Sequence, residues 1–136
     1  MKRKKKERSL PSYKKEAWSL LSKIIRLYYA DKDGYCRCVT CNVKKHWKEM
    51  QAGHFIDGRN NAILFVRIGI NPQCFACNIK KHGNKVEYFA YMLKKHGFSV
   101  INHLRTLKHQ TLKITREEYK EMIVRFKAEL KKLEGV

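Results

Sequence analysis

Apolar residues recur along residues 12–30 at the spacing of one face of an α-helix, and they predict the first long helix of the chain. This face carries Ala17, Leu20, Leu21, Ile24, Leu27 and Tyr28. Pro11 and Ser12 are typical of a helix start, and the polar segment 31–34 predicts the helix end. Trp18 and Tyr29 are expected to pack against the core or at its rim, with base stacking as the alternative.

Two apolar stretches in the middle of the chain predict strands. Residues 46–54 form the first and residues 63–68 (Ile-Leu-Phe-Val-Arg-Ile) the second. The segment between them, 57–61, is polar and rich in turn-forming residues. The simplest connection is therefore a β-hairpin with a long loop, after which Asn71-Pro72 is expected to turn the chain.

The C-terminal half predicts further helices. A helix is expected from residue 74 onward, with a break at 82–84, and an apolar stripe then carries it on to Gly97 through Val86, Phe89, Ala90 and Leu93. Ser99 is a candidate cap for a short helix. The last helix opens with Thr115-x-x-Glu118, a capping box, and its face contains Tyr119, Met122, Ile123, Phe126, Leu130 and Leu133. This face is expected to join the core, with a dimer contact as the alternative.

The net charge indicates that this mixed α and β domain has a polyanionic partner. The chain has 136 residues and a net charge of +19, and 25 basic against 11 acidic residues remain after the first eight are removed. Such an excess of basic residues indicates that the partner is a nucleic acid. The alternative is a surface whose charge serves only solubility. We expect a disordered basic arm at 1–10 and a single domain at 11–136, with its core at about 35–96 and C-terminal helices at about 98–134.

No apolar run follows the basic start, so a signal peptide is not expected, and no stretch approaches the length of a membrane span. The expected location is the cytoplasm, which is the bacterial host cytoplasm if the protein is phage-encoded.

Five cysteines supply the strongest motif in the chain. Cys38-x2-Cys41 and Cys74-x2-Cys77 form two knuckles about thirty residues apart, and two such pairs complete a closed tetrahedral site for a structural Zn²⁺ ion. An odd number of cysteines without secretion signals argues against a disulfide framework. Cys36 is the spare cysteine, and its spacing to Cys41 favours Cys38 as the ligand.

His54 and Asn78 are the residues that the predicted zinc site would hold in place. A β-hairpin followed by a helix, with two zinc knuckles, matches the ββα-metal layout, in which a histidine at the end of the first strand faces a divalent ion. Imidazole can deprotonate water near neutral pH, and a magnesium-like ion stabilises the charged phosphate. Magnesium or manganese needs oxygen ligands, which the Asn78 side chain can offer. Asn71 either orients His54 or starts a turn. Lys80 and Lys81, one turn on, are candidates to meet the scissile strand.

At these residues the sequence resembles the phage lambda NinG (Rap) recombination endonuclease family. The resemblance rests on Cys38-Val-Thr-Cys41, Ala52-Gly-His-Phe55, Gln73-Cys-Phe-Ala-Cys-Asn78, Lys81-x-Gly-Asn84 and Tyr88, and it runs from about residue 11 to the end. The cysteine, histidine and asparagine core also resembles phage endonuclease VII. The fold class is thus α+β, a ββα-metal (HNH-like) nuclease core with a four-cysteine zinc site, flanked by N- and C-terminal helices.

The resemblance implies magnesium-dependent hydrolysis of branched DNA, such as Holliday junctions and D-loops, during phage recombination, by a homodimer. It implies that His54 is the general base, Asn78 a ligand of the catalytic ion, and the four cysteines the zinc ligands. Gly53 stands where endonuclease VII has an acidic ligand. Asp57 is a candidate replacement, with Glu49, backbone or water as alternatives. Gly69 replaces the asparagine often found five residues before the second knuckle.

Three functions are compatible with these patterns. The leading hypothesis is a structure-selective DNA endonuclease, whose DNA contacts are expected from Lys44, Lys45, Arg59, Arg67, Lys80 and Lys81. The alternative is a non-catalytic zinc-ribbon nucleic-acid-binding protein, which Gly53 favours. The weakest hypothesis is a protein-interaction module that uses the C-terminal helix, because it leaves the net charge unexplained. No small-molecule cofactor and no membrane partner are expected.

Overall fold

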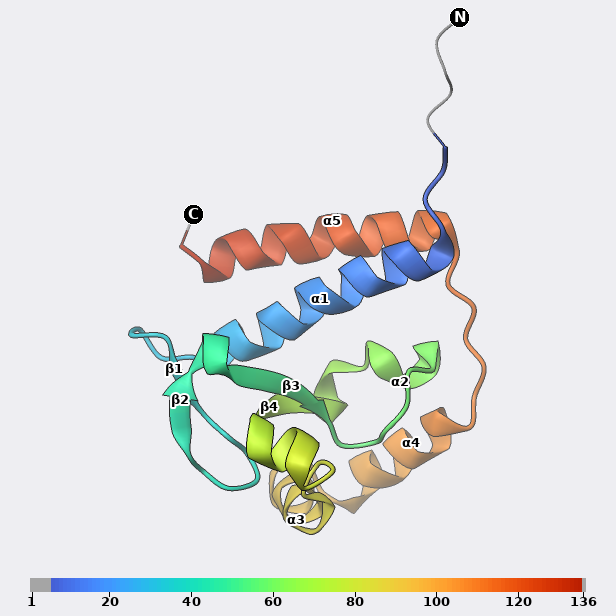
Figure 1. Ribbon diagram of the computed structural model, residues 1–136. Helices are drawn as coiled ribbons and strands as arrows, with labels where there is room; N and C mark the ends of the chain where they lie inside the picture. Colours follow the sequence, from blue (N-terminus) through green and yellow to red (C-terminus); the bar gives the residue numbers. More distant parts are fainter. Residues whose placement is uncertain (1–5, 136) are drawn as a thin grey trace, which may run out of the picture.

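The computed structural model describes residues 6–135 and has an α+β architecture, as predicted (Figure 1). Two long helices, α1 and α5, pack together on one side of the molecule, and two small antiparallel sheets and the shorter helices lie on the other. In chain order the helices and strands are α1 (Leu10–Tyr28), β1 (Tyr35–Arg37), β2 (Lys44–His46), η1 (Trp47–Glu49), β3 (Met50–His54), α2 (Asn61–Leu64), η2 (Arg67–Gly69), β4 (Ile70–Cys74), η3 (Ala76–Lys80), α3 (Lys85–His96), α4 (Phe98–Lys108) and α5 (Arg116–Leu133).

Helix α1 forms the floor of the main core. The Ser9 side chain caps its N-terminus by accepting a hydrogen bond from the Ser12 backbone N–H, and Pro11 lies in its first turn, where a missing N–H costs nothing. Its predicted apolar face is largely confirmed, because Ala17, Leu21 and Ile24 are buried. Tyr28 was wrongly included, since it is 66% exposed at the end of the helix.

Helix α5 covers this face of α1. The predicted capping box is present, with the Thr115 side chain accepting from the Glu118 N–H and the Glu118 carboxylate accepting from the Thr115 N–H. The predicted stripe is buried against α1 through Tyr119, Ile123, Phe126 and Leu130. The stripe thus belongs to the core of one chain, and the expected homodimer remains a prediction without a surface assigned to it.

The β-hairpin at the centre is confirmed, but its strands lie elsewhere than predicted. Strand β3 covers only the end of the predicted stretch 46–54, because the 3-10 turn η1 separates it from β2. The second strand is β4, Ile70–Cys74, and not residues 63–68. Strands β3 and β4 pair antiparallel, with Met50 opposite Cys74 and His54 opposite Ile70.

The apolar run at 63–68 instead folds back as the short helix α2 and the 3-10 turn η2. The Asn60 side chain caps α2 by accepting from the Ala62 N–H, and Ile63 and Leu64 are both buried as consecutive residues. A strand with one face in water would bury alternate residues, so the burial of neighbours favours the helical turn. Asn71-Pro72 does not turn the chain, since both lie inside β4 and Pro72 is paired with Ala52.

The helical stretch after residue 74 begins as the π-helical turn η3 and breaks at residues 81–84, close to the predicted break. Helix α3 then ends at Gly97, as predicted. Its predicted stripe was wrong, because Val86 is 81% exposed and the buried residues are Tyr88 and Met92. Gly97, and not Ser99, is the N-cap of α4.

The predicted basic arm, 1–10, falls mostly outside the residues that the structure describes, since residues 1–5 are not described and Leu10 already belongs to α1. Between residues 6 and 135, no helix has the length and apolar character needed to cross a bilayer. The division into an arm and one domain remains a prediction.

Candidate active site beside a four-cysteine cluster

The two knuckles converge on one cluster of cysteine sulfurs. Cys38 and Cys41 lie in the turn between β1 and β2, Cys74 ends β4, and Cys77 lies in η3. Their Sγ atoms all lie within 4.8 Å of one another, and those of Cys41 and Cys74 are 3.7 Å apart. A tetrahedral ion with Zn–S bonds of about 2.3 Å places its sulfurs about 3.8 Å apart. The donor set and its spacing therefore suit a structural Zn²⁺ ion.

Hydrogen bonds favour thiolates at part of the cluster, whereas burial raises the pKa of Cys41 and that of Cys74. The Asn84 amide lies 3.6 Å from Cys77 Sγ, and the Cys77 backbone N–H lies 3.4 Å from Cys74 Sγ. Burial alone would raise the pKa of Cys38, but hydrogen bonds from Thr40 and nearby backbone N–H groups outweigh it and lower the pKa to about 6. Burial raises the pKa of the spare thiol of Cys36, which lies outside the sulfur cluster.

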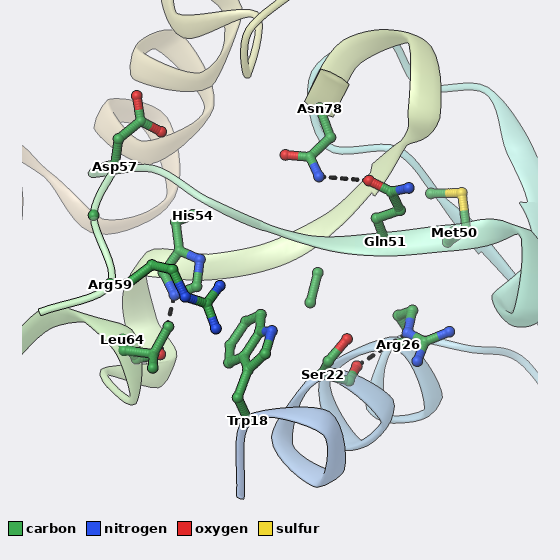
Figure 2. Close-up of a pocket in the computed structure, with 12 residues that line it drawn as sticks. Trp18, Ser22, Arg26, Met50, Gln51, His54, Asp57, Arg59, Leu64 and Asn78 are labelled. Carbon is green, nitrogen blue, oxygen red and sulfur yellow. Dashed lines mark hydrogen bonds between the residues drawn. The ribbon is translucent and has the colours of Figure 1, made fainter. Parts of the chain in front are cut away.

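A cleft of about 500 Å³ lies beside this cluster, along β3 (Figure 2). One wall comes from α1, through Trp18, Ser22 and Arg26. The opposite wall comes from the zinc-knuckle turn η3, and the end of the cleft from the loop that follows β3. The cleft therefore joins segments from the first helix, the hairpin and the second knuckle.

His54 ends β3 and lies half-buried in this cleft. Its Nε2 atom is 3.0 Å from the Leu64 carbonyl oxygen, and its ring lies 4.8 Å from the Trp18 ring, between centroids. A carbonyl oxygen only accepts hydrogen bonds, so Nε2 must carry the proton in the neutral ring. Nδ1 then keeps a free lone pair, and Figure 2 shows this nitrogen on the open side of the ring.

The environment of His54 favours the neutral ring. Burial lowers the pKa of His54 below its usual value of 6.5, and the positive charges of Lys85 and Arg59 act in the same direction. The Leu64 carbonyl and the Asp57 carboxylate oppose the shift without overcoming it. The imidazole is thus available as a proton acceptor at neutral pH.

Asn78 faces the same cleft from η3, and Gln51 on β3 fixes its orientation. The Asn78 Nδ2 atom donates to Gln51 Oε1 at 2.6 Å. With the amide nitrogen held in this way, the Asn78 Oδ1 atom points away from Gln51 and into the cleft (Figure 2). A free amide oxygen of this kind is an acceptable ligand for a hard divalent cation.

Asp57 lines the cleft from the loop after β3, and Lys85 engages one of its two carboxylate oxygens. Lys85 Nζ lies 3.0 Å from Asp57 Oδ1 and donates to the backbone oxygens of His54 and Phe55 at 2.8 Å each. Glu49, the alternative acidic ligand, lies exposed in η1 and does not line the cleft. Among the described residues that line the cleft, Asn78 thus offers an amide oxygen whose orientation a neighbouring side chain fixes.

Asn71 lies on the other face of the hairpin from the His54 ring. Its side chain is buried and donates to the Tyr88 hydroxyl at 3.1 Å, and this hydroxyl in turn donates to the Gly53 carbonyl at 2.7 Å. Asn71 thus braces the backbone next to His54 and does not enter the cleft. Its predicted catalytic role remains a prediction.

Gly53, the departure from the acidic ligand of endonuclease VII, has a packing reason. A Cβ atom at this position would lie 1.9 Å from the Gln73 Oε1 atom. Gln73 is fully buried and donates to the Thr40 hydroxyl and to the Gly83 carbonyl, so it joins the two knuckles. The space that a side chain at residue 53 would need is occupied by this bridge.

The predicted DNA-contacting residues are not all gathered at the cleft. Arg59 lines it, and Lys80 and Lys81 are exposed at the end of η3, a turn beyond Asn78. Lys44 and Lys45 lie on β2, with Lys44 Nζ 3.5 Å from Asp31. Arg67 is separate, because it donates to both carboxylate oxygens of Glu129 on α5, one of them at 2.6 Å.

Sequence reasoning missed three residues that line the cleft, Trp18, Arg26 and Gln51, and one that supports it, Lys85. Trp18 and Arg26 come from α1. Trp18 was expected to pack at the core or rim, with base stacking as the alternative, and Arg26 was assigned no role. Gln51 and Lys85 position Asn78 and the backbone at His54. Gln51 precedes His54 by three residues, and this polar residue in a mostly buried strand was the one local signal that could have drawn attention to it.

Comparison with known proteins decides the family. A family model described as Bacteriophage Lambda NinG protein matches residues 1–135. The chain belongs to the NinG family. No curated protein and no solved structure matches the chain. For this NinG protein, therefore, the family and the α+β fold with its four-cysteine cluster are established, and the chemistry of the cleft must be argued from the geometry.

Proposed function

We propose that the protein is a metal-dependent, structure-selective DNA endonuclease, with His54 as its general base. The observation that carries the proposal is the presence, in one cleft, of a histidine with a free Nδ1 lone pair and of an asparagine with a free Oδ1 atom. The proposal also draws on the resemblance to nucleases with a zinc-stapled ββα-metal core.

In this mechanism His54 Nδ1 takes a proton from a water molecule, whose oxygen forms a bond to the scissile phosphorus as the bond to the leaving sugar oxygen breaks. The Leu64 carbonyl holds the Nε2–H group and stabilises the imidazolium that forms. Asn78 Oδ1, fixed by Gln51, would hold a divalent cation such as Mg²⁺ or Mn²⁺. Bound there, the cation would supply positive charge to the pentacovalent phosphate and to the leaving oxygen.

The basic surface supports DNA as the substrate. Arg26 and Arg59 line the cleft itself, and among residues 6–135 Asp57 is the one acidic residue in its lining. Branched DNA, such as a Holliday junction or a D-loop, is the substrate that the resemblance implies. In this scheme the four-cysteine cluster has a structural role. It holds Asn78, which follows Cys77, and the end of β4 at Cys74 in place.

The test is cleavage of a labelled four-way junction beside linear duplex of the same sequence, with and without magnesium. We expect magnesium-dependent, junction-selective cutting by the wild type and a loss of at least a hundredfold in His54→Ala, because general-base catalysis contributes about 10²–10⁴-fold. His54→Ala should keep its DNA affinity and zinc content. Loss of binding together with cutting would instead assign a structural role to His54.

The second candidate is a non-catalytic zinc-ribbon nucleic-acid-binding protein. One observation favours it, namely the lack of space for a side chain at Gly53, where endonuclease VII has an acidic metal ligand. Tight DNA binding without cutting by the wild type under Mg²⁺ or Mn²⁺ would support this candidate against the endonuclease.

A further inference from the structure

A second hollow, larger than the cleft, lies where the start of α1 meets the segment 109–115 that joins α4 to α5. Its volume is about 900 Å³. Figure 1 shows this segment passing beside α2, and Asn60 and Asn61 hold it there by donating to the backbone oxygens of Lys108, Gln110 and Leu112. We call this hollow the linker groove, and its walls have two chemical characters.

The floor of the linker groove is aliphatic. It is formed by Leu10 and Pro11 at the start of α1 and by Leu112 and Ile114 from the linking segment. Leu10 is 41% exposed and Leu112 is 51% exposed, and both line the groove. The floor therefore offers apolar surface to a ligand.

The rim of the linker groove is basic throughout. It carries Lys14, Lys15, Arg59 and Lys113, and within residues 6–135 no acidic residue lines the groove and none pairs with these four cations. Lys14 Nζ donates to the Arg59 backbone oxygen at 2.6 Å. Burial and the Arg59 charge both lower the pKa of Lys14, as expected for cations held together without an anion.

Arg59 connects this groove to the cleft, because it lines both. The backbone of one DNA strand can thus run from His54 past Arg59 into the linker groove. In a duplex the base faces are stacked on one another, and an aliphatic floor would find nothing apolar to contact. Unpaired nucleotides expose their base faces together with their phosphates, which matches an apolar floor with a basic rim.

We propose that the linker groove binds the unpaired stretch of a DNA strand whose phosphate lies in the cleft. This proposal rests on the proposed function in one respect, since it takes the strand to be the one presented to His54. The groove explains how the protein would recognise a branch point, where strands separate, without reading a base sequence.

The test measures binding and not cutting, so that it does not depend on the nuclease activity. In the His54→Ala chain, fluorescence anisotropy would compare a labelled fifteen-nucleotide thymidine strand with a duplex of the same length. The floor variant combines Leu10→Ser with Leu112→Ser, and the rim variant combines Lys15→Gln with Lys113→Gln. Val124→Ser and Lys131→Gln on the exposed side of α5 are the matched controls.

We expect the floor variant to lose about tenfold in affinity for the single strand and to keep its affinity for the duplex, because only unpaired bases expose apolar faces that the leucines can cover. The rim variant should lose affinity for both, and the controls for neither. Crosslinks from 4-thiothymidine in the single strand should map to residues 109–115.

An unchanged single-strand affinity in a folded floor variant would overturn the proposal. So would displacement of the strand from the groove by a peptide of alternating aspartate and leucine at lower concentration than by unlabelled strand, because the groove would then be a peptide site. A wild-type chain that binds the strand through the groove but cuts no DNA would refute the endonuclease and leave the groove standing.

Discussion

At the scale of single residues, the cleft is set by a few hydrogen bonds that fix which atoms stay free. The Leu64 carbonyl selects the tautomer of His54, and Gln51 selects the orientation of the Asn78 amide. Neither choice adds a charged group to the cleft. Both leave an electron-pair donor, Nδ1 or Oδ1, directed at the same space, and this is what the proposed chemistry requires.

Because burial lowers the pKa of His54, we expect an NMR titration to place it below 6.5. The unfolded chain then binds a proton at His54 more tightly than the folded chain, so the free energy of unfolding should fall as the pH drops from 6.5 through the folded-state pKa. The rate of DNA cutting should fall over the same pH range, because a protonated His54 cannot accept a proton from water. Trp18→Ala should move the pKa back toward 6.5, because it exposes the ring to water. A His54 pKa above 6.5 in the wild type would contradict this prediction.

Gly53→Ala should destabilise the protein, because its Cβ atom would meet Gln73 Oε1 and this buried side chain cannot move without breaking its hydrogen bonds to Thr40 and Gly83. Overpacking of this kind costs about 1–3 kcal/mol in the free energy of unfolding. Gly69→Ala is the matched control, since its Cβ atom would meet Leu104 at an ordinary 3.4 Å. Chemical denaturation measures both, and equal losses would show that the Gln73 bridge is not the cause.

At the scale of elements, the two knuckles tie together segments that lie about thirty residues apart in the sequence. The turn between β1 and β2, the end of β4 and the π-helical turn η3 meet at the sulfurs, with Cys36, Met50 and Trp47 packed around them. Such a small apolar cluster is a weak core by itself, and a bound metal ion would supply the missing stability. The position of Asn78 depends on this connection, because it directly follows Cys77.

Cys74→Ala should therefore lose zinc and most of the cooperative unfolding transition, since metal-binding energy in such sites is folding energy. Cys36→Ala is the matched control, because Cys36 is buried in the same region but lies outside the sulfur cluster. Zinc content by mass spectrometry and thermal unfolding by circular dichroism measure the effect. A Cys74→Ala protein without zinc that melts like the wild type would exclude a stabilising role for the metal.

At the scale of the whole molecule, the cations behind the net charge of +19 differ in whether an acidic residue pairs with them. Part of it is neutralised within the fold, as in the pair of Arg67 with Glu129 and that of Lys23 with Glu134. The unpaired cations of the cleft and of the linker groove remain available to phosphates. Affinity for DNA is accordingly expected to fall steeply with salt, because each neutralised phosphate releases counterions.

Arg59→Gln should lower the slope of log affinity against log salt by about one unit, since one phosphate contact contributes about 0.9 to that slope in duplex DNA. Arg67→Gln should leave the slope unchanged, because its charge already pairs with Glu129. Titrations between low and physiological salt measure both slopes. Equal slopes for Arg59→Gln and the wild type would remove Arg59 from the DNA path.

The sequence by itself determined the features that depend on neighbours along the chain. Two cysteines two residues apart share a turn whatever the rest of the fold does, and the capping box of α5 joins residues 115 and 118 through local hydrogen bonds. The apolar stripes of α1 and α5 follow helical spacing, so their buried faces could be predicted as well. These local rules were enough to predict the fold class, the cysteine cluster and the position of His54 at a strand end.

Only the tertiary structure decided which distant segments meet. The run 63–68 has a strand-like composition, but it folds as a helical turn that brings the Leu64 carbonyl to His54. Strand β4, whose side chains are all buried, pairs with β3 instead. The wall that Trp18 gives to the cleft, the hold of Gln51 on Asn78 and the linker groove likewise arise between segments far apart in sequence. No periodicity encodes such contacts, because they depend on how whole helices and hairpins pack against one another.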